Sequence, residues 1–176
     1  NHNGNLGTAL QLVDLAAEAG VDAVKFQTFK ADRLATPSAP KAEYQLRTTD
    51  VAESQYEMLR RLELSPEMHY AVMDRCRERD IIFLSSPFDE ESADLLSDLD
   101  VAAFKIPSGE ITNLPLLAHI ARKGKPMIVS TGMSNLSEVA AAVRTIEKAG
   151  NQDLVLLQCT SNYPAKLNES NLRAIN

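Results

Sequence analysis

Short apolar runs alternate with longer amphipathic stretches along the whole chain. The short runs are rich in β-branched and aromatic residues and end in turn signals, which is typical of strands. We expect strands over residues 22–28, 81–85, 102–106, 127–131 and 154–160. The alternation of strand-like and helix-like segments predicts an α/β fold.

The amphipathic stretches carry helix start and stop signals. Ser65 and Pro66 are a favourable N-cap and first helical residue, and Gly20, Gly124 and Gly150 each follow the last apolar position of a stretch. These signals predict helices over residues 6–19, 66–79, 89–98, 114–123 and 134–149, and another beginning near Glu169. Residues 29–64 are expected to form a long polar connection before the second helix.

Strands joined by helical crossovers predict a parallel sheet, either a doubly wound open sheet or a (β/α)8 TIM barrel. Every predicted strand ends in polar or ionisable residues, whereas an open sheet concentrates its ligand groups at one switch point. The barrel is therefore favoured. Because only five strands are predicted and none precedes the first helix, we expect residues 1–176 to form a single, partial TIM-barrel catalytic domain.

Composition narrows the function classes. The 176 residues are 44% hydrophobic and 24% charged, which is enough to bury a core, and the net charge is -6. An acidic balance argues against nucleic acid and against a polybasic membrane surface. No apolar run approaches the roughly 18–20 residues that span a bilayer. Cys76 and Cys159 form no metal-type pair or disulfide framework, so a cytoplasmic location is expected.

Two lysines stand in strands between apolar neighbours. Alternation places Lys25 and Gln27 on one strand face and Phe26 on the other, and Lys105 has the same setting. A single strand-end lysine usually reaches solvent or pairs with a carboxylate. Two such lysines at the same end of a parallel sheet favour an anionic ligand, because an unpaired buried ammonium is costly.

Small hydroxyl and glycine loops follow three of the strands, at residues 85–87, 107–110 and 130–132. Their backbone N–H groups and hydroxyls near helix N-termini suit phosphate or carboxylate. Serine and glycine are also ordinary turn and cap residues. From the residues alone, an anion site and simple turns both stay open.

Glu110 is the carboxylate that these loops would hold beside the lysines. It could contact a sugar hydroxyl, act as an acid or base, or simply cap the following helix. His69 and His119 fall within predicted helices and lack metal-ligand spacing, so we expect packed or surface roles for them. No metal ligand is assigned in this chain.

Seven short sequence motifs (words) follow one another along the whole chain. They are NHNG at 1–4, VKFQT at 24–28, AEYQ at 42–45, SSPF at 85–88, FKIPSGE at 104–110, STGM at 130–133 and CTSNYP at 159–164. In this order they resemble the sialic acid synthase family, which contains the N-acetylneuraminate, legionaminate and pseudaminate synthases. The second and third words look closer to the neuraminate and legionaminate branches.

The resemblance implies a (β/α)8 barrel followed by a small antifreeze-like domain. It also implies a C–C bond-forming transferase that condenses phosphoenolpyruvate with an N-acetylmannosamine-type sugar to a nonulosonic acid. In the family reaction, C3 of the enol phosphate attacks the open-chain sugar aldehyde. Water then adds at C2 and phosphate is lost.

The resemblance also assigns residues. Those implied to bind phosphoenolpyruvate are Lys25, Ser86, Lys105, Ser108, Ser130 and Ser161. Those implied to face the sugar are Gln27, Tyr44, Glu110 and Tyr163. Glu110 and Lys105 are the expected catalytic pair.

The family uses a divalent metal, usually manganese, to polarise the aldehyde. In the family, the histidine ligands belong to motifs that follow the fifth strand seen here. The family's Glu-Ile-Gly motif, which comes just before Asn-His-x-Gly, is also absent from this chain. The resemblance therefore implies manganese ligands outside this chain segment, no turnover by the segment alone, and a homodimeric full-length protein. Ser161 stands where some members have asparagine, which replaces an amide contact to phosphate by a hydroxyl.

Two alternatives remain. A TIM-barrel aldolase would use Lys105 or Lys25 as a Schiff-base nucleophile, since a partly buried lysine can lose its proton. A non-catalytic phosphosugar-binding domain would use the same anion site without turnover.

Overall fold

A computed structural model of the chain describes residues 2–41 and 53–175. One parallel sheet runs through it in the order β1-β2-β3-β4-β5. The strands are β1 (Ala23–Thr28), β2 (Ile82–Pro87), β3 (Phe104–Ile106), β4 (Met127–Ser130) and β5 (Leu154–Leu157). Each strand pairs with the next in sequence. A doubly wound sheet reverses its strand order at a switch point, and this sheet has no such reversal. The sheet is five consecutive strands of a (β/α)8 barrel, as the sequence predicts.

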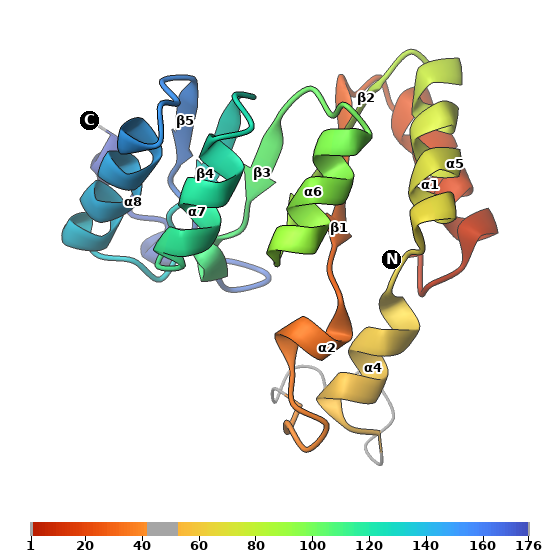
Figure 1. Cartoon of the computed structure of the whole chain (residues 1–176), viewed down its shortest axis with the longest axis horizontal. Helices are drawn as coiled ribbons and strands as arrows, with labels where there is room; N and C mark the ends of the chain where they lie inside the picture. Colours follow the sequence, from red (N-terminus) through yellow and green to blue (C-terminus); the bar gives the residue numbers. More distant parts are fainter. Residues whose placement is uncertain (1, 42–52, 176) are drawn as a thin grey trace.

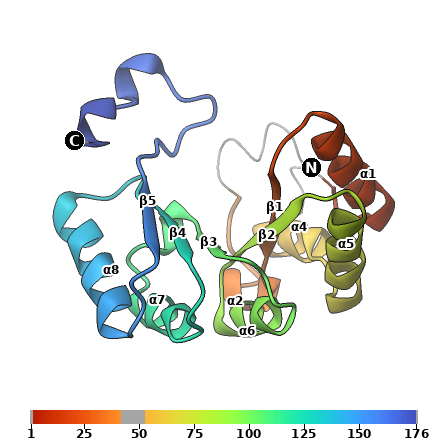
Figure 2. The ribbon, with the colours of Figure 1, turned by 90° about the horizontal axis from the view of Figure 1, so that it is seen from above.

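The helices beside the sheet are α1 (Leu6–Glu18), α5 (Pro66–Glu78), α6 (Glu90–Asp98), α7 (Leu114–Ala121) and α8 (Leu136–Lys148). In Figures 1 and 2, α5, α6, α7 and α8 lie along one side of the sheet. Strand residues that alternate toward this side are buried in the core, among them Phe26, Phe83, Phe104, Met127 and Val129. The opposite face carries Lys25, Gln27, Ser86, Lys105 and Ser130 together with the apolar residues Leu84 and Ile128.

The predicted helix boundaries hold because their local signals are satisfied. The Ser65 hydroxyl accepts a hydrogen bond from the backbone N–H of Met68, and Pro66 begins α5. Asp89 caps α6 and Asn113 caps α7 in the same way. At the end of α8, Gly150 takes a φ of +97°, which an L-residue rarely adopts.

The expectation of a helix-free connection over residues 29–64 is wrong. This connection contains α2 (Ala31–Leu34) and α4 (Gln55–Leu62), which lie against each other beyond one end of the sheet (Figure 1). Their lengths are short and their composition is polar, so the apolar period is weak. A usable signal was present: Ser54 and Glu57 form a capping box at the start of α4.

The end of the chain also differs from the prediction. Strand β5 stops at Leu157, not at residue 160, and no α-helix begins near Glu169. Two 3-10 turns, η2 (Leu167–Glu169) and η3 (Leu172–Ile175), occupy that region. Within the described chain β5 pairs only with β4, and the chain leaves the sheet after Leu157 (Figure 2).

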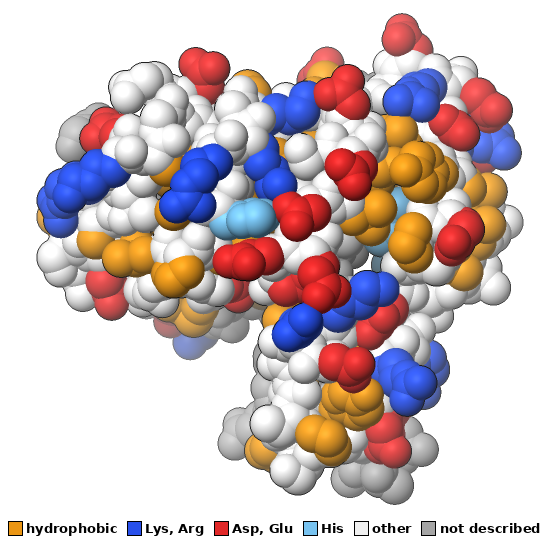
Figure 3. Space-filling view, in the orientation of Figure 1, with side chains coloured by type: hydrophobic (Ala, Val, Ile, Leu, Met, Phe, Trp, Pro, Cys, Tyr) orange, Lys and Arg blue, Asp and Glu red, His pale blue; other side chains and the backbone are white. Residues whose placement is uncertain are grey.

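The face of the molecule seen in Figure 3 mixes acidic and basic side chains and shows no field of one sign. Asp94 on α6 accepts hydrogen bonds from His119 and Lys123, with distances of 2.6 and 2.5 Å to the same carboxylate oxygen. His119 is thus a surface residue, as expected. Over the described residues, no helix is long and apolar enough to cross a membrane.

Candidate active site

The strand face opposite the helices carries most of the residues singled out from the sequence. Register pairs Gln27 on β1 with Ser86 on β2, and Lys25 with Leu84. Lys105 on β3 lies between two residues that are fully buried toward the helices, so its side chain takes the opposite face. The expected alternation at Lys25 and Lys105 is confirmed.

Lys105 links two neighbouring strands. Its Nζ donates hydrogen bonds to the Ile106 carbonyl at 2.8 Å and to the Ser130 hydroxyl at 2.5 Å. Burial lowers the pKa of Lys105, and the nearby charge of Lys25 lowers it further. Ser130 is buried at the end of β4, so the amine and the hydroxyl are held together.

Lys25 is the second cation of this face. Its side chain remains accessible to solvent, yet the protein atoms around it lower its pKa through desolvation. Among the described residues, neither Lys25 nor Lys105 forms an ion pair. The two ammonium groups therefore repel one another without a carboxylate between them, and an anion would relieve that repulsion.

Ser86 provides an unused hydroxyl on the same face. It is 1% exposed, and its Oγ has no hydrogen-bond partner within the described part of the chain. Buried hydroxyls are normally paired, and each exception calls for an explanation. Ser85, one residue earlier, faces the helices and is fully paired there. The orphaned Ser86 hydroxyl fits a site whose partner is a ligand.

Ser108 and Ser161 meet around Gly132. The backbone N–H of Gly132 donates to Ser108 Oγ at 3.0 Å. A Cβ at residue 132 would lie 2.5 Å from Ser161 Oγ and 2.8 Å from Ser108 Oγ, so only glycine fits without movement. The sequence indicated a loop here but gave no sign that Gly132 is the point where two other loops converge.

Glu110 lies in the 3-10 turn η1 (Ser108–Glu110) that directly follows β3. Its carboxylate accepts a hydrogen bond from the Asn113 side chain at 2.9 Å. Asn113, not Glu110, caps α7 through a bond from the Leu116 N–H. Glu110 is therefore not the helix cap that one interpretation of the sequence allowed. Its carboxylate instead binds the side chain of Asn113, which is the cap.

The predicted sugar-facing residues are less well assembled. Gln27 is exposed on the site face of β1. Tyr163 is 94% exposed in the segment after β5, so its side chain is not packed against Lys25 and Lys105, here called the lysine cluster. Tyr44 falls outside the described residues. Within residues 2–41 and 53–175, no group of three or more His, Cys, Asp or Glu side chains could hold a metal ion.

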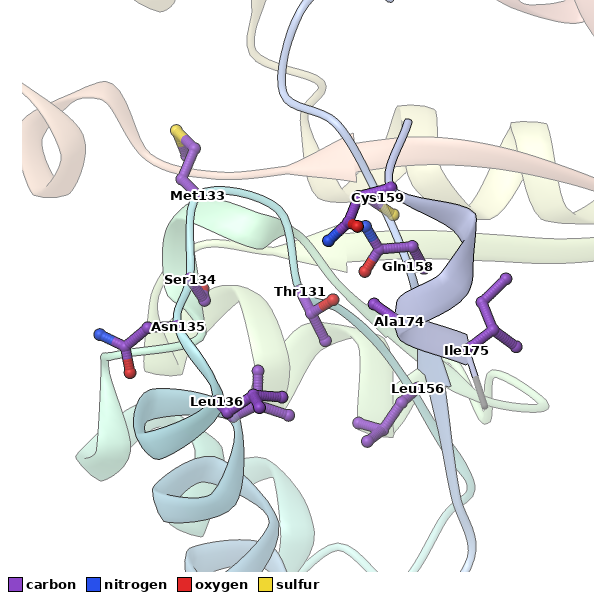
Figure 4. Close-up of a pocket in the computed structure, with 12 residues that line it drawn as sticks. Thr131, Met133, Ser134, Asn135, Leu136, Leu156, Gln158, Cys159, Ala174 and Ile175 are labelled. Atoms are coloured by element: carbon purple, nitrogen blue, oxygen red, sulfur yellow. The ribbon is translucent and has the colours of Figure 1, made fainter. Parts of the chain in front are cut away.

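A separate pocket of about 660 Å³ opens beside β5, between α8 and η3. Figure 4 shows Leu136 and Leu156 facing this space, with Thr131 and Gln158 at its rim. Leu136 is 84% exposed and Leu156 is 43% exposed. None of the expected phosphoenolpyruvate-binding residues lines this pocket, so it is distinct from the lysine cluster.

The chain is similar to known proteins over almost its whole length. Over 99% of its length the chain is 49% identical to an N,N'-diacetyllegionaminic acid synthase of Campylobacter jejuni and 51% identical to one of Legionella pneumophila, covering 53% and 50% of those proteins. A pseudaminic acid synthase of Helicobacter pylori is 32% identical over 98% of the chain and is covered to 51%. The chain thus spans about half the length of the curated relatives it matches.

Among solved structures, the N-acetylneuraminic acid synthetase of Leptospira borgpetersenii, in complex with citrate, superimposes with a TM-score of 0.83. Its sequence is 30% identical, over 99% of this chain and 56% of that one. Residues 12–176 match the NeuB family. The chain therefore belongs to the NeuB family.

Proposed function

We propose that the protein containing this chain condenses phosphoenolpyruvate with an N-acetylmannosamine-type sugar, forming a nonulosonic acid and releasing phosphate. The observation that carries the proposal is the pair Lys25 and Lys105. Both lie on the site face of the sheet, and neither forms an ion pair among the described residues. Phosphoenolpyruvate carries a carboxylate and a phosphate, which two ammonium groups can neutralise.

The remaining anion contacts would come from serine hydroxyls. Ser86 contributes an unpaired buried Oγ, and Ser130 is already hydrogen bonded to Lys105. Ser108 and Ser161 lie on either side of Gly132. We assign these serines and the two lysines to phosphoenolpyruvate. Fixed donors of this kind stabilise an anion without reorganising when it binds.

The sugar would lie on the outer side of this cluster. We assign Gln27, Glu110, Tyr44 and Tyr163 to it, with Glu110 as the acid or base. The Glu110 carboxylate is oriented by Asn113, which supports a positioned role in proton transfer. Tyr163 would have to close over the bound sugar, because it is largely exposed without one.

The sugar branch is suggested by the relatives. Identity is 49% and 51% to the two N,N'-diacetyllegionaminic acid synthases and 32% to the pseudaminic acid synthase. This supports a diacetamido analogue of mannosamine as the preferred substrate, with N-acetylmannosamine as the main competitor.

The described residues do not fit a metal site, because they hold no suitable cluster of ligands. We keep the proposal that the complete protein uses manganese, with ligands supplied by parts of the protein outside this segment. No role of the residues described above depends on that ion.

A Schiff-base aldolase is the second candidate, favoured by the lowered pKa of Lys105. Against it, the Lys105 amine donates to two acceptors, and a charged ammonium makes such bonds most strongly. Borohydride treatment in the presence of pyruvate separates the two. A trapped adduct on Lys105 or Lys25 would support the aldolase.

The test of the proposed function uses the complete protein with phosphoenolpyruvate, manganese and each candidate sugar. We expect phosphate release only when both substrates are present, and a product mass equal to their sum plus water minus phosphoric acid. Binding of both ligands without phosphate release would support a non-catalytic phosphosugar-binding protein instead.

A further inference from the structure

A buried hydrogen-bond network lies directly behind the site face of β1 and β2. His69 on α5 is 1% exposed, and its Nδ1 lies 2.9 Å from the Ser65 carbonyl oxygen. Its Nε2 lies 2.8 Å from Thr28 Oγ1, which lies 2.7 Å from Ser85 Oγ. We call Ser65, His69, Thr28 and Ser85 the His69 network.

The direction of the hydrogen bonds follows from the groups involved. A backbone carbonyl only accepts, so the imidazole proton is on Nδ1 and donates to Ser65. When the ring is neutral, Nε2 then accepts from the Thr28 hydroxyl. The Thr28 oxygen in turn accepts from Ser85. With a neutral ring in this tautomer, each of these hydrogen bonds has one donor and one acceptor.

The network ends one residue from the proposed ligand groups. Thr28 follows Gln27 on β1, and Ser85 precedes Ser86 on β2. Because neighbouring strand residues point to opposite faces, holding Thr28 and Ser85 toward α5 turns Gln27 and Ser86 toward the site. The backbone pairing of Gln27 with Ser86 lies between these two anchored positions.

We propose that His69 is a positioning residue: through Thr28 and Ser85 it fixes the orientation of Gln27 and Ser86 in the ligand site. This inference rests on the proposed function, because its effect is measured on phosphoenolpyruvate. His69 touches no ligand in this account and acts only through the two strand ends.

The surroundings of His69 keep it neutral. Burial lowers its pKa, and the nearby charges of Lys30 and His2 act in the same direction, while the bond to the Ser65 carbonyl opposes them. No carboxylate contributes to the shift. Protonation would put a second donor on the ring, facing Thr28, and would force both hydroxyls to reverse. The oriented network therefore persists at neutral pH.

The test compares Thr28→Val with Thr28→Ser in the complete protein. Valine keeps the shape of threonine without the hydroxyl, whereas serine keeps the hydroxyl. We expect the KM for phosphoenolpyruvate to rise about fivefold to tenfold in Thr28→Val, as for loss of one hydrogen bond, with a smaller change in kcat. Thr28→Ser should restore the wild-type KM. His119→Gln, at the surface histidine, is the control and should leave both constants unchanged.

The same variants report on the imidazole by ¹⁵N NMR. Wild type should show a neutral His69 with the proton on Nδ1. In Thr28→Val, the ¹⁵N chemical shift of Nε2 should move to that of a nitrogen that accepts no hydrogen bond. If Thr28→Val does not fold, Ser85→Ala removes the other hydroxyl of the network and gives the same comparison. If the wild type turns over and the folded Thr28→Val or Ser85→Ala variant has an unchanged KM for phosphoenolpyruvate, the role of His69 is wrong. The proposed function would still stand. Absence of any turnover by wild type would overturn the proposed function, and with it this role for His69.

Discussion

Lys105 donates a hydrogen bond to the Ser130 hydroxyl across 2.5 Å, joining the ends of β3 and β4 at the site. Register brings the two strands side by side, with Lys105 paired to Ile128. The lysine is thus held in place before any ligand binds. A pre-positioned ammonium loses little side-chain freedom on binding, which favours affinity for an anion.

Replacing Lys105 by methionine keeps the length of the side chain and removes its charge. We expect the KM for phosphoenolpyruvate to rise about 10-fold to 100-fold in the complete protein, because a charge-assisted contact contributes roughly 1.5–3 kcal/mol. The KM for the sugar should change less. Lys125→Met is the matched control, since Lys125 pairs with Asp100 away from the site. A changed sugar KM with an unchanged phosphoenolpyruvate KM would remove Lys105 from the anion site.

The two lysines should titrate as a coupled pair. Burial and Lys25 lower the pKa of Lys105, so its ammonium loses a proton at lower pH than an ordinary lysine. The kcat/KM for phosphoenolpyruvate should therefore fall as pH rises toward that pKa. Lys25→Gln removes the repelling charge and should move this alkaline inflection to higher pH, whatever it does to affinity. An inflection that stays in place would show that the two charges are not coupled.

Gly132 is expected to tolerate no side chain. In Gly132→Ala the new Cβ would lie 2.5 Å from Ser161 Oγ, which must move, and the Ser108 contact would be strained. We expect weaker phosphoenolpyruvate binding with little change in thermal stability. Gly109→Ala is the control from the same region, because a Cβ there meets no atom within 4 Å. Equal effects in the two variants would argue against a role for the Ser108–Ser161 contact.

Glu110→Gln tests the acid–base assignment. The amide keeps the size and the hydrogen-bonding capacity toward Asn113 but cannot transfer a proton. We expect kcat to fall by on the order of 10². Asn113→Ala removes both the α7 cap and the bond that orients Glu110, so it should cost about 1 kcal/mol of stability and also lower kcat. Near wild-type turnover of Glu110→Gln would leave its carboxylate with only the contact to Asn113.

Local chemistry made much of this fold predictable. Ser65-Pro66 and Asn113 predict where their helices begin, and the apolar neighbours of Lys25 and Lys105 predict which strand face the lysines occupy. The same reasoning failed where tertiary context decides. No local signal shows that Gly132 lies between Ser108 and Ser161, or that Thr28 reaches a histidine 41 residues away.

Residues 1–176 should associate when expressed alone. Val155 is 54% exposed and Leu156 is 43% exposed on β5, which pairs on one side only within the described structure. An apolar strand edge of this kind promotes association. We expect oligomers or aggregates by sedimentation, and no manganese-dependent condensation. A monomeric segment that turns over both substrates would show that the residues assigned here are sufficient without the rest of the protein.

Phosphate release by the complete protein, measured with and without the sugar, is the decisive test of the proposed condensation. We predict that phosphoenolpyruvate alone gives no phosphate and that adding a diacetamido or N-acetylated mannosamine starts phosphate release. In the Lys105→Met variant, release should be suppressed at low phosphoenolpyruvate concentration and partly restored at high concentration. The proposed condensation would be wrong if phosphate release did not depend on the sugar. It would also be wrong if both substrates bound and no candidate sugar gave release.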